Sequence, residues 1–286
     1  MPDYRVINTG ARCRLGEGPL WSARQQSLFW VDILGRTVFR LRLADGSVSS
    51  WPMPEMIGWI IEREHAGGFV AGFQSGFAYL ELEPLSITPI ANPEPGRAGQ
   101  RMNDAKADRH GRIWAGTMPV TADRPSGALY RLDPGATITQ WDSGYIVTNG
   151  PAFSPDGRHF YHNDSGRGLV YRFDLDAAGN PRERRVFLQF GTGDGKPDGM
   201  TVDAQGGLWI AFWGGARLSR FTADARLDRS IALPASQVSS CAFAGDALDR
   251  LFVTTAADGV EDEPLAGALF EVDPGVAGLP PHRFAG

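Results

Sequence analysis

Residues 16–32 read GEGPLWSARQQSLFWVD: a polar residue beside glycine opens a short apolar segment, a turn follows, and a second segment ends in aromatic residues. The same order recurs in NDAKADRHGRIWAGTM from Asn103, NGPAFSPDGRHFYHND from Asn149 and DGMTVDAQGGLWIAFWGG from Asp198. A fifth copy begins at Ser240, and a weaker sixth begins at Gly58. Each copy predicts a β-hairpin, because two apolar segments flank a turn in which glycine supplies a positive φ.

The spacing of the copies predicts how these hairpins assemble. The first residues of the copies at Glu17, Asn103, Asn149, Asp198 and Ser240 are 86, 46, 49 and 42 residues apart, and the first interval holds two repeats. A strand-rich period of 40 to 50 residues without helical periodicity is typical of a β-propeller, with one four-stranded sheet per period. Third segments such as TVFRLRL and GALYRLD continue the alternation, and the segments between copies supply the outer strands. The sequence therefore predicts an all-β, six-bladed β-propeller with residues 1–286 as a single domain.

Composition agrees with a fold that has many short strands. The chain contains 36 glycines and 20 prolines, which is well above the usual level and indicates frequent tight turns. The proline-rich segment 91–100 is interpreted as a loop between blades. In a propeller, the large aromatic residues are expected first in the core between neighbouring sheets; they include Trp30, Trp114, Trp209, Trp213, Phe29 and Phe252.

Charge and cysteine usage exclude several classes of protein. The 28 basic and 33 acidic residues give a net charge of −5 without basic runs, which argues against nucleic acid and anionic membranes as partners. No apolar segment has the length of a secretory signal or of a membrane span, so a cytoplasmic location is expected. Cys13 and Cys241 are too few for a disulfide framework and are expected to be small buried side chains.

The residues that open the copies are candidates for function. The innermost strand of each propeller blade lines the central channel, so Glu17, Asn103, Asn149 and Asp198 should converge near its mouth. Two carboxylates held together without a cation would repel and raise each other's pKa, whereas a divalent metal makes their proximity favourable. Alternatively, acidic residues at such glycine-rich corners accept backbone hydrogen bonds only. The recurrence of polar side chains at the same repeat position favours a metal site in the central channel.

The set Glu17, Asn149 and Asp198 offers only oxygen ligands with a formal charge of −2. Such a set suits Ca²⁺, Mg²⁺ or Mn²⁺, with Zn²⁺ or Fe²⁺ as further possibilities. Arg101, two residues before Asn103, is either a surface side chain or a guanidinium that binds substrate oxygens at the channel mouth. His162 and Asp164 either support the metal ligands from the next strand or satisfy the polar end of a blade.

Six motifs distributed along the chain resemble one known family. They are LGEGPLW at 15–21, RMNDAKAD at 101–108, WAGTM at 114–118, TNGPAFSPDG at 148–157, PDGMTVD at 197–203 and GALFEVD at 267–273. Together they resemble the gluconolactonase and regucalcin (senescence marker protein) family, in the right order and over essentially the whole chain. The resemblance implies a six-bladed propeller with one divalent metal ion on the axis.

The resemblance also implies an activity and roles for residues. Family members mostly hydrolyse sugar lactones such as glucono-, xylono-, arabino- and galactonolactone, and the matching positions assign the metal to Glu17, Asn149 and Asp198. Arg101 and Asn103 would contact the substrate. As a hypothesis, Asp198 would act as general base while a metal-activated water attacks the lactone carbonyl. Some relatives carry a substrate-binding acidic residue after GTM, whereas this chain has PVT at 119–121, which leaves the choice of sugar open.

Two other functions compete with this interpretation. A regucalcin-like protein would bind calcium for regulation without significant turnover, and a bare propeller would serve only as an interaction scaffold. A lactonase predicts a small-molecule sugar lactone as its partner, and a closed propeller is expected to be a monomer. Acid release from lactones would separate the enzyme from both alternatives.

Overall fold

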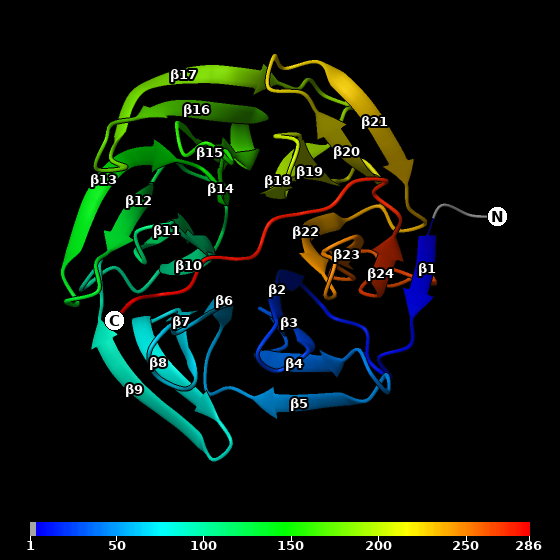
Figure 1. The fold of residues 1–286 in the computed structure, drawn as a ribbon, viewed down its shortest axis with the longest axis horizontal. Helices are drawn as coiled ribbons and strands as arrows, with labels where there is room; N and C mark the ends of the chain where they lie inside the picture. Colours follow the sequence, from blue (N-terminus) through cyan, green and yellow to red (C-terminus); the bar gives the residue numbers. More distant parts are fainter. Residues whose placement is uncertain (1–3) are drawn as a thin grey trace.

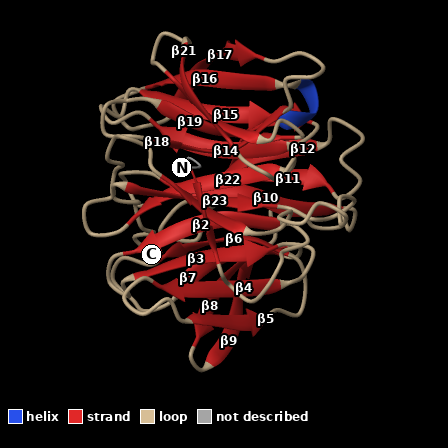
Figure 2. Ribbon diagram, turned by 90° about the vertical axis from the view of Figure 1, so that its right-hand side faces the viewer, coloured by secondary structure: helices blue, strands red, loops and turns tan. Residues whose placement is uncertain are grey.

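The computed structural model describes residues 4–286 and forms a closed ring of six antiparallel sheets around a central channel (Figure 1). The described residues contain 24 strands, four in each sheet, and one short 3₁₀ turn, η1 (Ser165–Arg167). Seen from the side, the strands are stacked between two faces that carry the loops (Figure 2). The predicted six-bladed β-propeller is confirmed.

The first three blades follow the chain from the inner strand to the outer strand. Blade 1 consists of β2 (Gly16–Ser22), β3 (Ser27–Asp32), β4 (Thr37–Arg42) and β5 (Val48–Pro52). Blade 2 consists of β6 (Ile57–Glu62), β7 (Phe69–Phe73), β8 (Gly76–Leu82) and β9 (Leu85–Ala91). Blade 3 consists of β10 (Gln100–Ala107), β11 (Ile113–Pro119), β12 (Gly127–Leu132) and β13 (Ile138–Tyr145).

The next two blades repeat this order, and the sixth takes its outer strand from the start of the chain. Blade 4 consists of β14 (Thr148–Phe153), β15 (His159–Asp164), β16 (Leu169–Leu175) and β17 (Pro181–Gln189). Blade 5 consists of β18 (Lys196–Val202), β19 (Leu208–Trp213), β20 (Arg217–Phe221) and β21 (Leu227–Ala232). Blade 6 consists of β22 (Val238–Ala244), β23 (Arg250–Thr255), β24 (Leu269–Val272) and β1 (Tyr4–Ile7).

Blade 6 closes the ring by joining the two ends of the chain. β1 pairs antiparallel with β24, in a register that places Tyr4 opposite Val272 and Ile7 opposite Leu269. The repeat did not predict this strand, because Tyr4–Ile7 lies before the first copy. The pairing covers an edge of β24 that would otherwise expose unpaired backbone groups.

Aromatic side chains fill the spaces between neighbouring sheets. Trp30, Trp114 and Trp209 expose 2% or less of their surface, and Phe29 and Phe252 are fully buried. Trp213 is an exception: it ends β19 and is only half-buried, so the prediction of a core position is wrong for this residue. Cys13 and Cys241 are both buried, as expected.

The predicted hairpin turns also hold the core in place. Asp108 accepts hydrogen bonds from Trp114 Nε1 at 2.8 Å and from Arg112 Nε at 2.6 Å. The same arrangement recurs in blade 5, where Asp203 accepts a hydrogen bond from Trp209 Nε1 at 2.9 Å. A buried carboxylate is tolerated only when it is paired and hydrogen-bonded, and these turn residues meet that condition.

After β24 the chain crosses one mouth of the channel, as the red trace in Figure 1 shows. We call residues 274–286 the C-terminal strap. Gly278 N donates to the carbonyl oxygen of Leu248 at 2.7 Å on one side, and Phe284 N donates to that of Glu62 at 2.8 Å on the other. The strap therefore spans the channel from blade 6 to blade 2. Within residues 4–286, no helix has the length and apolar character needed to cross a membrane.

Candidate functional site

The candidate site lies at the end of the channel opposite the strap. The predicted residues Glu17, Arg101, Asn103, Asn149 and Asp198 all lie near the beginnings of the inner strands β2, β10, β14 and β18. Each is at least nine-tenths buried. We call this the ring end of the channel and define it by these five residues.

A β-bulge in each inner strand aims these side chains at the channel. The pairing register shifts between Glu17 and Leu20 in β2, and between Asn149 and Ala152 in β14. Equivalent shifts follow Met102 in β10 and Pro197 in β18, just before the candidate residues of those strands. A bulge opposes two residues to one on the neighbouring strand and redirects their side chains, and such bulges are frequent next to active sites.

Glycines allow the bulges of neighbouring blades to approach each other closely. Gly150 has φ +53°, and a Cβ atom there would lie 3.0 Å from the carbonyl oxygen of Asp198. A Cβ atom on Gly58 would lie 2.6 Å from the carbonyl oxygen of Asn103. Blade 2 therefore contributes a close backbone contact rather than a polar side chain, which explains why its sequence copy is the weakest.

Hydrogen bonds connect three blades at the ring end. Arg101 Nη1 donates to Asn103 Oδ1 at 2.6 Å, and Asn103 Nδ2 donates to Asn149 Oδ1 at 2.8 Å. Asn149 Nδ2 donates to Ser165 Oγ at 2.9 Å, and this hydroxyl donates to the carbonyl oxygen of Pro197 at 2.5 Å. The structure thus brings Arg101, Asn103 and Asn149 together and fixes the orientation of both amides.

Three carboxyl groups are buried at the ring end: Glu17, Asp104 and Asp198, each with 4% or less of its surface exposed. Burial and, to a smaller extent, the charge of Asp104 raise the pKa of Glu17 to about 8. Burial, followed by the charges of Glu17 and Asp104, raises the pKa of Asp198 well above its usual range. Burial also lowers the pKa of Arg101 to about 10, which leaves its guanidinium charged at neutral pH. The ring end therefore holds more buried acid than its own cations neutralise.

These groups fit a divalent cation. Oδ1 of Asp198 is buried and has no hydrogen-bond partner among residues 4–286, which is costly for a carboxylate unless a ligand satisfies it. Glu17 and Asp198 supply two carboxylates and Asn149 one amide oxygen, a donor set that suits a hard cation. In the described residues, no group of three or more His, Cys, Asp and Glu side chains is arranged to hold a metal. The candidate set has only two such side chains and depends on the asparagine for its third ligand.

A cavity of about 370 Å³ lies beside Arg101, between blades 2 and 3. Its lining includes Gln74, Glu94, Gln100 and Thr117 but none of the three candidate metal ligands. Glu94 is buried and accepts a hydrogen bond from Thr117 Oγ1 at 3.2 Å. The loop 92–99 thus brings a carboxylate to the cavity that Arg101 also lines, although the segment 119–121 contains none.

The positions of His162 and Asp164 decide between the two interpretations of this pair. His162 is fully buried, its ring lies edge-on to Tyr145 with centroids 4.8 Å apart, and burial lowers its pKa to about 3. Asp164 accepts hydrogen bonds from the backbone nitrogens of Ile146 and Val147, both at 3.3 Å. Neither side chain contacts a candidate metal ligand, so both belong to the blade rather than to the site.

Their neighbours in the sequence support the ring instead. Asn163 lies opposite Asn149 in the sheet, and its Nδ2 donates to the carbonyl oxygen of Asp198 at 2.6 Å. Asp104 Oδ2 accepts a hydrogen bond from Gly150 N at 2.8 Å. Sequence reasoning missed Asp104, Asn163 and Ser165. Strand alternation next to His162 is the signal that could have identified Asn163.

Comparison with known proteins identifies relatives along the whole chain. Residues 15–257 match the family model described as SMP-30/Gluconolactonase/LRE-like region. The chain is 36% identical over 278 residues to a 6-deoxy-6-sulfogluconolactonase of Pseudomonas putida, with 95% of each protein covered. It is 34% identical over 300 residues to regucalcin of Gallus gallus, with both chains fully covered.

A solved structure has the same fold over nearly the same length. It is that of regucalcin from Agrobacterium tumefaciens, described as a calcium-binding protein, and it superimposes with a TM-score of 0.93. The two sequences are 27% identical, and the match covers 98% of this chain and 97% of the other. The predicted resemblance is thereby confirmed at the level of sequence and of fold.

Proposed function

Because the chain belongs to the SMP-30/gluconolactonase/LRE-like family, we propose that it hydrolyses a sugar lactone to the aldonic acid in a metal-dependent reaction. The observation that carries this proposal is the ring end itself. Two buried carboxyl groups with raised pKa values, Glu17 and Asp198, lie beside the buried guanidinium of Arg101. The candidate substrates are aldonolactones such as glucono-, xylono-, arabino- and galactonolactone.

Glu17, Asn149 and Asp198 would hold the metal. When bound, a divalent cation would supply the positive charge that polarises a lactone carbonyl and favours deprotonation of water. Asp198 would bind the metal through Oδ1, which has no hydrogen-bond partner among residues 4–286, and its other carboxylate oxygen would accept the proton of the attacking water and then pass it to the ring oxygen that leaves. The ester bond breaks as the new carbon–oxygen bond forms, so the products are one carboxylic acid and one hydroxyl group.

Arg101 and Asn103 would have different roles towards the substrate. Arg101 Nη1 donates to Asn103 Oδ1 and to the carbonyl oxygen of Met102, and its remaining N–H groups have no partner among residues 4–286. They are available to a carbonyl oxygen that gains negative charge. Both amide hydrogens of Asn103 are used internally, on Asn149 Oδ1 and on the carbonyl oxygen of Thr148. Asn103 would therefore orient Arg101 and accept from a sugar hydroxyl, rather than donate.

The polar cavity beside Arg101 would receive the hydroxyl-bearing part of the sugar. Gln74, Gln100 and Thr117 line it with side chains that can both donate and accept hydrogen bonds. Buried polar groups of this kind discriminate strongly among ligands, because a ligand that lacks the matching hydroxyl leaves them unpaired. The cavity would thus set the preference among sugar lactones.

The test is a pH-indicator assay of proton release across a panel of pentono- and hexonolactones. The protein is first chelated, and each divalent metal is then restored separately. Turnover that disappears on chelation and returns with a metal supports the proposal. Turnover that persists in chelated protein at the full rate would contradict the metal-dependent mechanism.

The same ligand set also suits a calcium-binding regulatory protein, which the regucalcin relatives favour. That alternative predicts tight calcium binding together with no acid release from any lactone under any metal. Calorimetric titration of calcium alongside the lactone panel distinguishes the two functions in one preparation. A variant with Asp224→Asn, an exposed acid of blade 5, serves as the matched control for substitutions at the ring.

A further inference from the structure

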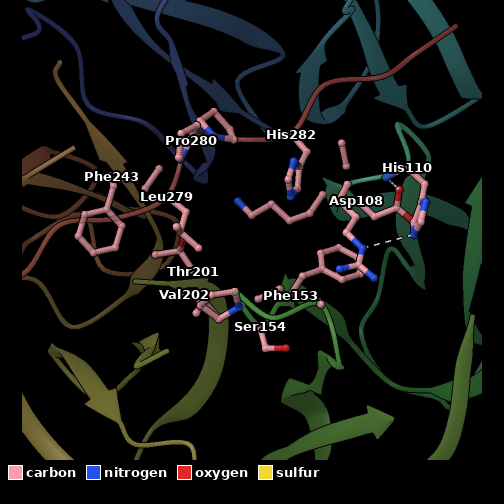
Figure 3. Close-up of a pocket in the computed structure, with 18 of the residues that line it drawn as sticks. Asp108, His110, Phe153, Ser154, Thr201, Val202, Phe243, Leu279, Pro280 and His282 are labelled. Carbon is pink, nitrogen blue, oxygen red and sulfur yellow. Dashed lines mark hydrogen bonds between the residues drawn. The ribbon is translucent and has the colours of Figure 1, made fainter. Parts of the chain in front are cut away.

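A second cavity, of about 360 Å³, lies at the other end of the channel (Figure 3). It is lined by the far ends of the inner strands, beyond the bulges, and by the strap residues 279–282. We call this the strap end and define it by Lys106, Phe153, Val202, Phe243, Leu279 and His282. Figure 3 shows Leu279 and Pro280 on the strap, facing the cavity that Val202 and Phe153 also line.

The strap is fixed on both sides of this cavity. Ala204 N donates to the carbonyl oxygen of Ala277 at 2.9 Å, and Ala285 N donates to that of Gly111 at 3.0 Å. Between these anchors, Pro280 and Pro281 restrict the backbone while it crosses the opening. The cavity is therefore a preformed pocket with a fixed wall, which is the usual condition for binding a small molecule.

Two cations at this pocket have no carboxylate partner. The ammonium group of Lys106 makes no hydrogen bond or ion pair with any of residues 4–286, although the backbone of Lys106 is paired in β10 opposite Trp114. Arg109 reaches only His110 Nε2 at 3.5 Å and the carbonyl oxygen of Asp156 at 3.4 Å. The charge of Lys106 partly offsets, from a distance, the rise that burial causes in the pKa of Glu17 and of Asp104, but neither carboxyl group forms an ion pair with it.

Two further ionisable groups line the pocket without neutralising these cations or adding to their charge: Asp108 and His282. Asp108 is occupied by Arg112 and by Trp114 Nε1, so its carboxylate does not neutralise Lys106 or Arg109. Burial lowers the pKa of His282, which keeps its imidazole neutral at physiological pH. The strap end thus carries a net positive charge on a mostly apolar lining.

We propose that the strap end is a second binding site, which takes a small organic carboxylate with a compact apolar body. The carboxylate would pair with Lys106 and Arg109, and the apolar body would contact Phe153, Val202, Phe243 and Leu279. An aldonic acid does not fit this chemistry, because its hydroxyls would be desolvated against apolar side chains. The site is therefore distinct from the one proposed for the lactone and its product.

The test is calorimetric titration of the full-length protein with phenylbutyrate near neutral pH, compared with phenylbutanamide and with gluconate. The acid should bind about 10- to 100-fold more tightly than the amide, as a charge-assisted hydrogen bond requires. Gluconate should bind more weakly than phenylbutyrate. The proposal is overturned if the acid does not bind, or if the amide or gluconate binds equally well.

Variants assign the binding to this pocket. Lys106→Met should weaken phenylbutyrate binding by about 10- to 100-fold. Lys196→Met, at the only other lysine, should leave it unchanged. Leu279→Glu places a negative charge in the pocket at a side chain that is 38% exposed, so the fold should tolerate it while binding is lost.

Asp198→Asn separates this proposal from the lactonase proposal. Phenylbutyrate binding should survive that substitution and should be the same in chelated and metal-loaded protein, because the strap end contains none of the candidate metal ligands. If binding is lost with Asp198→Asn, or is retained in both Lys106→Met and Leu279→Glu, the ligand lies elsewhere and the inference is wrong. A variant that loses lactone turnover but still binds phenylbutyrate is consistent with the second binding site.

Discussion

The two ends of the central channel are built from the same inner strands but differ in the polarity and charge of their side chains. In β10, Arg101, Asn103 and Asp104 lie at the ring end, and Lys106, two residues after Asp104, lines the strap end. The bulge between Met102 and Ala105 separates the two regions. Arg101 before the bulge and Asn103 and Asp104 within it are polar, whereas after it the regular pairing returns and the channel lining becomes mainly apolar. One irregular pair of residues thus allows a single strand to serve two kinds of site.

The imbalance of charge also has opposite signs at the two ends. At the ring end, burial and, to a smaller extent, the charges of neighbouring carboxylates raise the pKa values of Glu17 and Asp198. At the strap end, Lys106 and Arg109 have no carboxylate partner within the described residues 4–286. Under the two proposals, the ring end binds a divalent cation and the strap end binds an organic carboxylate, so each end binds a ligand of opposite charge to its own side chains.

The largest expected effect is the loss of the Asp198 carboxylate. Asp198→Asn keeps the side-chain size but removes the proposed proton acceptor and one proposed negative ligand, so lactone turnover should fall about 1,000-fold or more. Stopped-flow measurements of proton release at a saturating metal concentration quantify this loss. Asp224→Asn in the same blade should retain wild-type turnover. An Asp198→Asn enzyme that keeps a tenth of the activity would show that the ring end is not the reaction site.

A smaller loss is expected for Arg101→Gln. The substitution removes a buried charged donor that we propose lies next to the reacting carbonyl, and kcat/KM should fall about 10- to 100-fold. Arg97 lines the same cavity, but it pairs with Glu94 at 2.9 Å and is half exposed. Arg97→Gln is therefore the matched control and should cost less than Arg101→Gln. Equal losses in the two variants would mean that the charge of the cavity matters, rather than its position at Arg101.

Local rules in the sequence were enough for most of the fold and for part of the ring end. Turn residues and alternation identified the hairpins, because those signals depend on neighbouring residues only. β1 and the strap were not predicted, since they depend on pairing between distant parts of the chain. Asp104 was missed because strict alternation places it on the face opposite Asn103. Only the bulge lets both residues support the ring.

The stability of the metal-free protein should depend on pH in a way that reflects the buried acids. A carboxyl group whose pKa is raised on folding binds its proton more tightly in the native state, so stability falls as pH rises towards the folded pKa. For Glu17 that value is about 8. His162 and His282 have lowered pKa values, so their contribution makes stability rise with pH. This contribution is confined to pH values below about 6.5, where an unfolded histidine titrates. Between about pH 7 and 8.5 the acids should dominate, and the Tm of chelated protein should decrease.

Differential scanning calorimetry of chelated protein measures this slope, and Glu17→Gln should flatten it. A metal at about 100 times its Kd should add about 2.7 kcal/mol, which corresponds to an increase in Tm of about 5 °C for a chain of this size. The increase should be greater at the upper end of the pH range, because the cation binds the ionised acids. A Tm of the chelated protein that rises between about pH 7 and 8.5 would contradict the assignment of Glu17 as a buried carboxyl group with a raised pKa.

The smallest effect is expected where a residue positions a ligand without contacting the metal. Ser165 Oγ accepts from Asn149 Nδ2 at 2.9 Å and donates to the carbonyl oxygen of Pro197, so it fixes the amide of Asn149, the proposed metal ligand. Ser165→Ala removes hydrogen bonds worth about 1 kcal/mol, and metal affinity measured by calorimetry should fall about two- to tenfold. Ser165→Thr keeps the hydroxyl and should restore the affinity, whereas Ser154→Ala, in the hairpin turn of the same blade, should not change it. If Ser165→Ala lowered thermal stability but left metal affinity unchanged, Ser165 would stabilise blade 4 without orienting Asn149. The comparison between the two ends of the channel would then depend on the carboxylates alone.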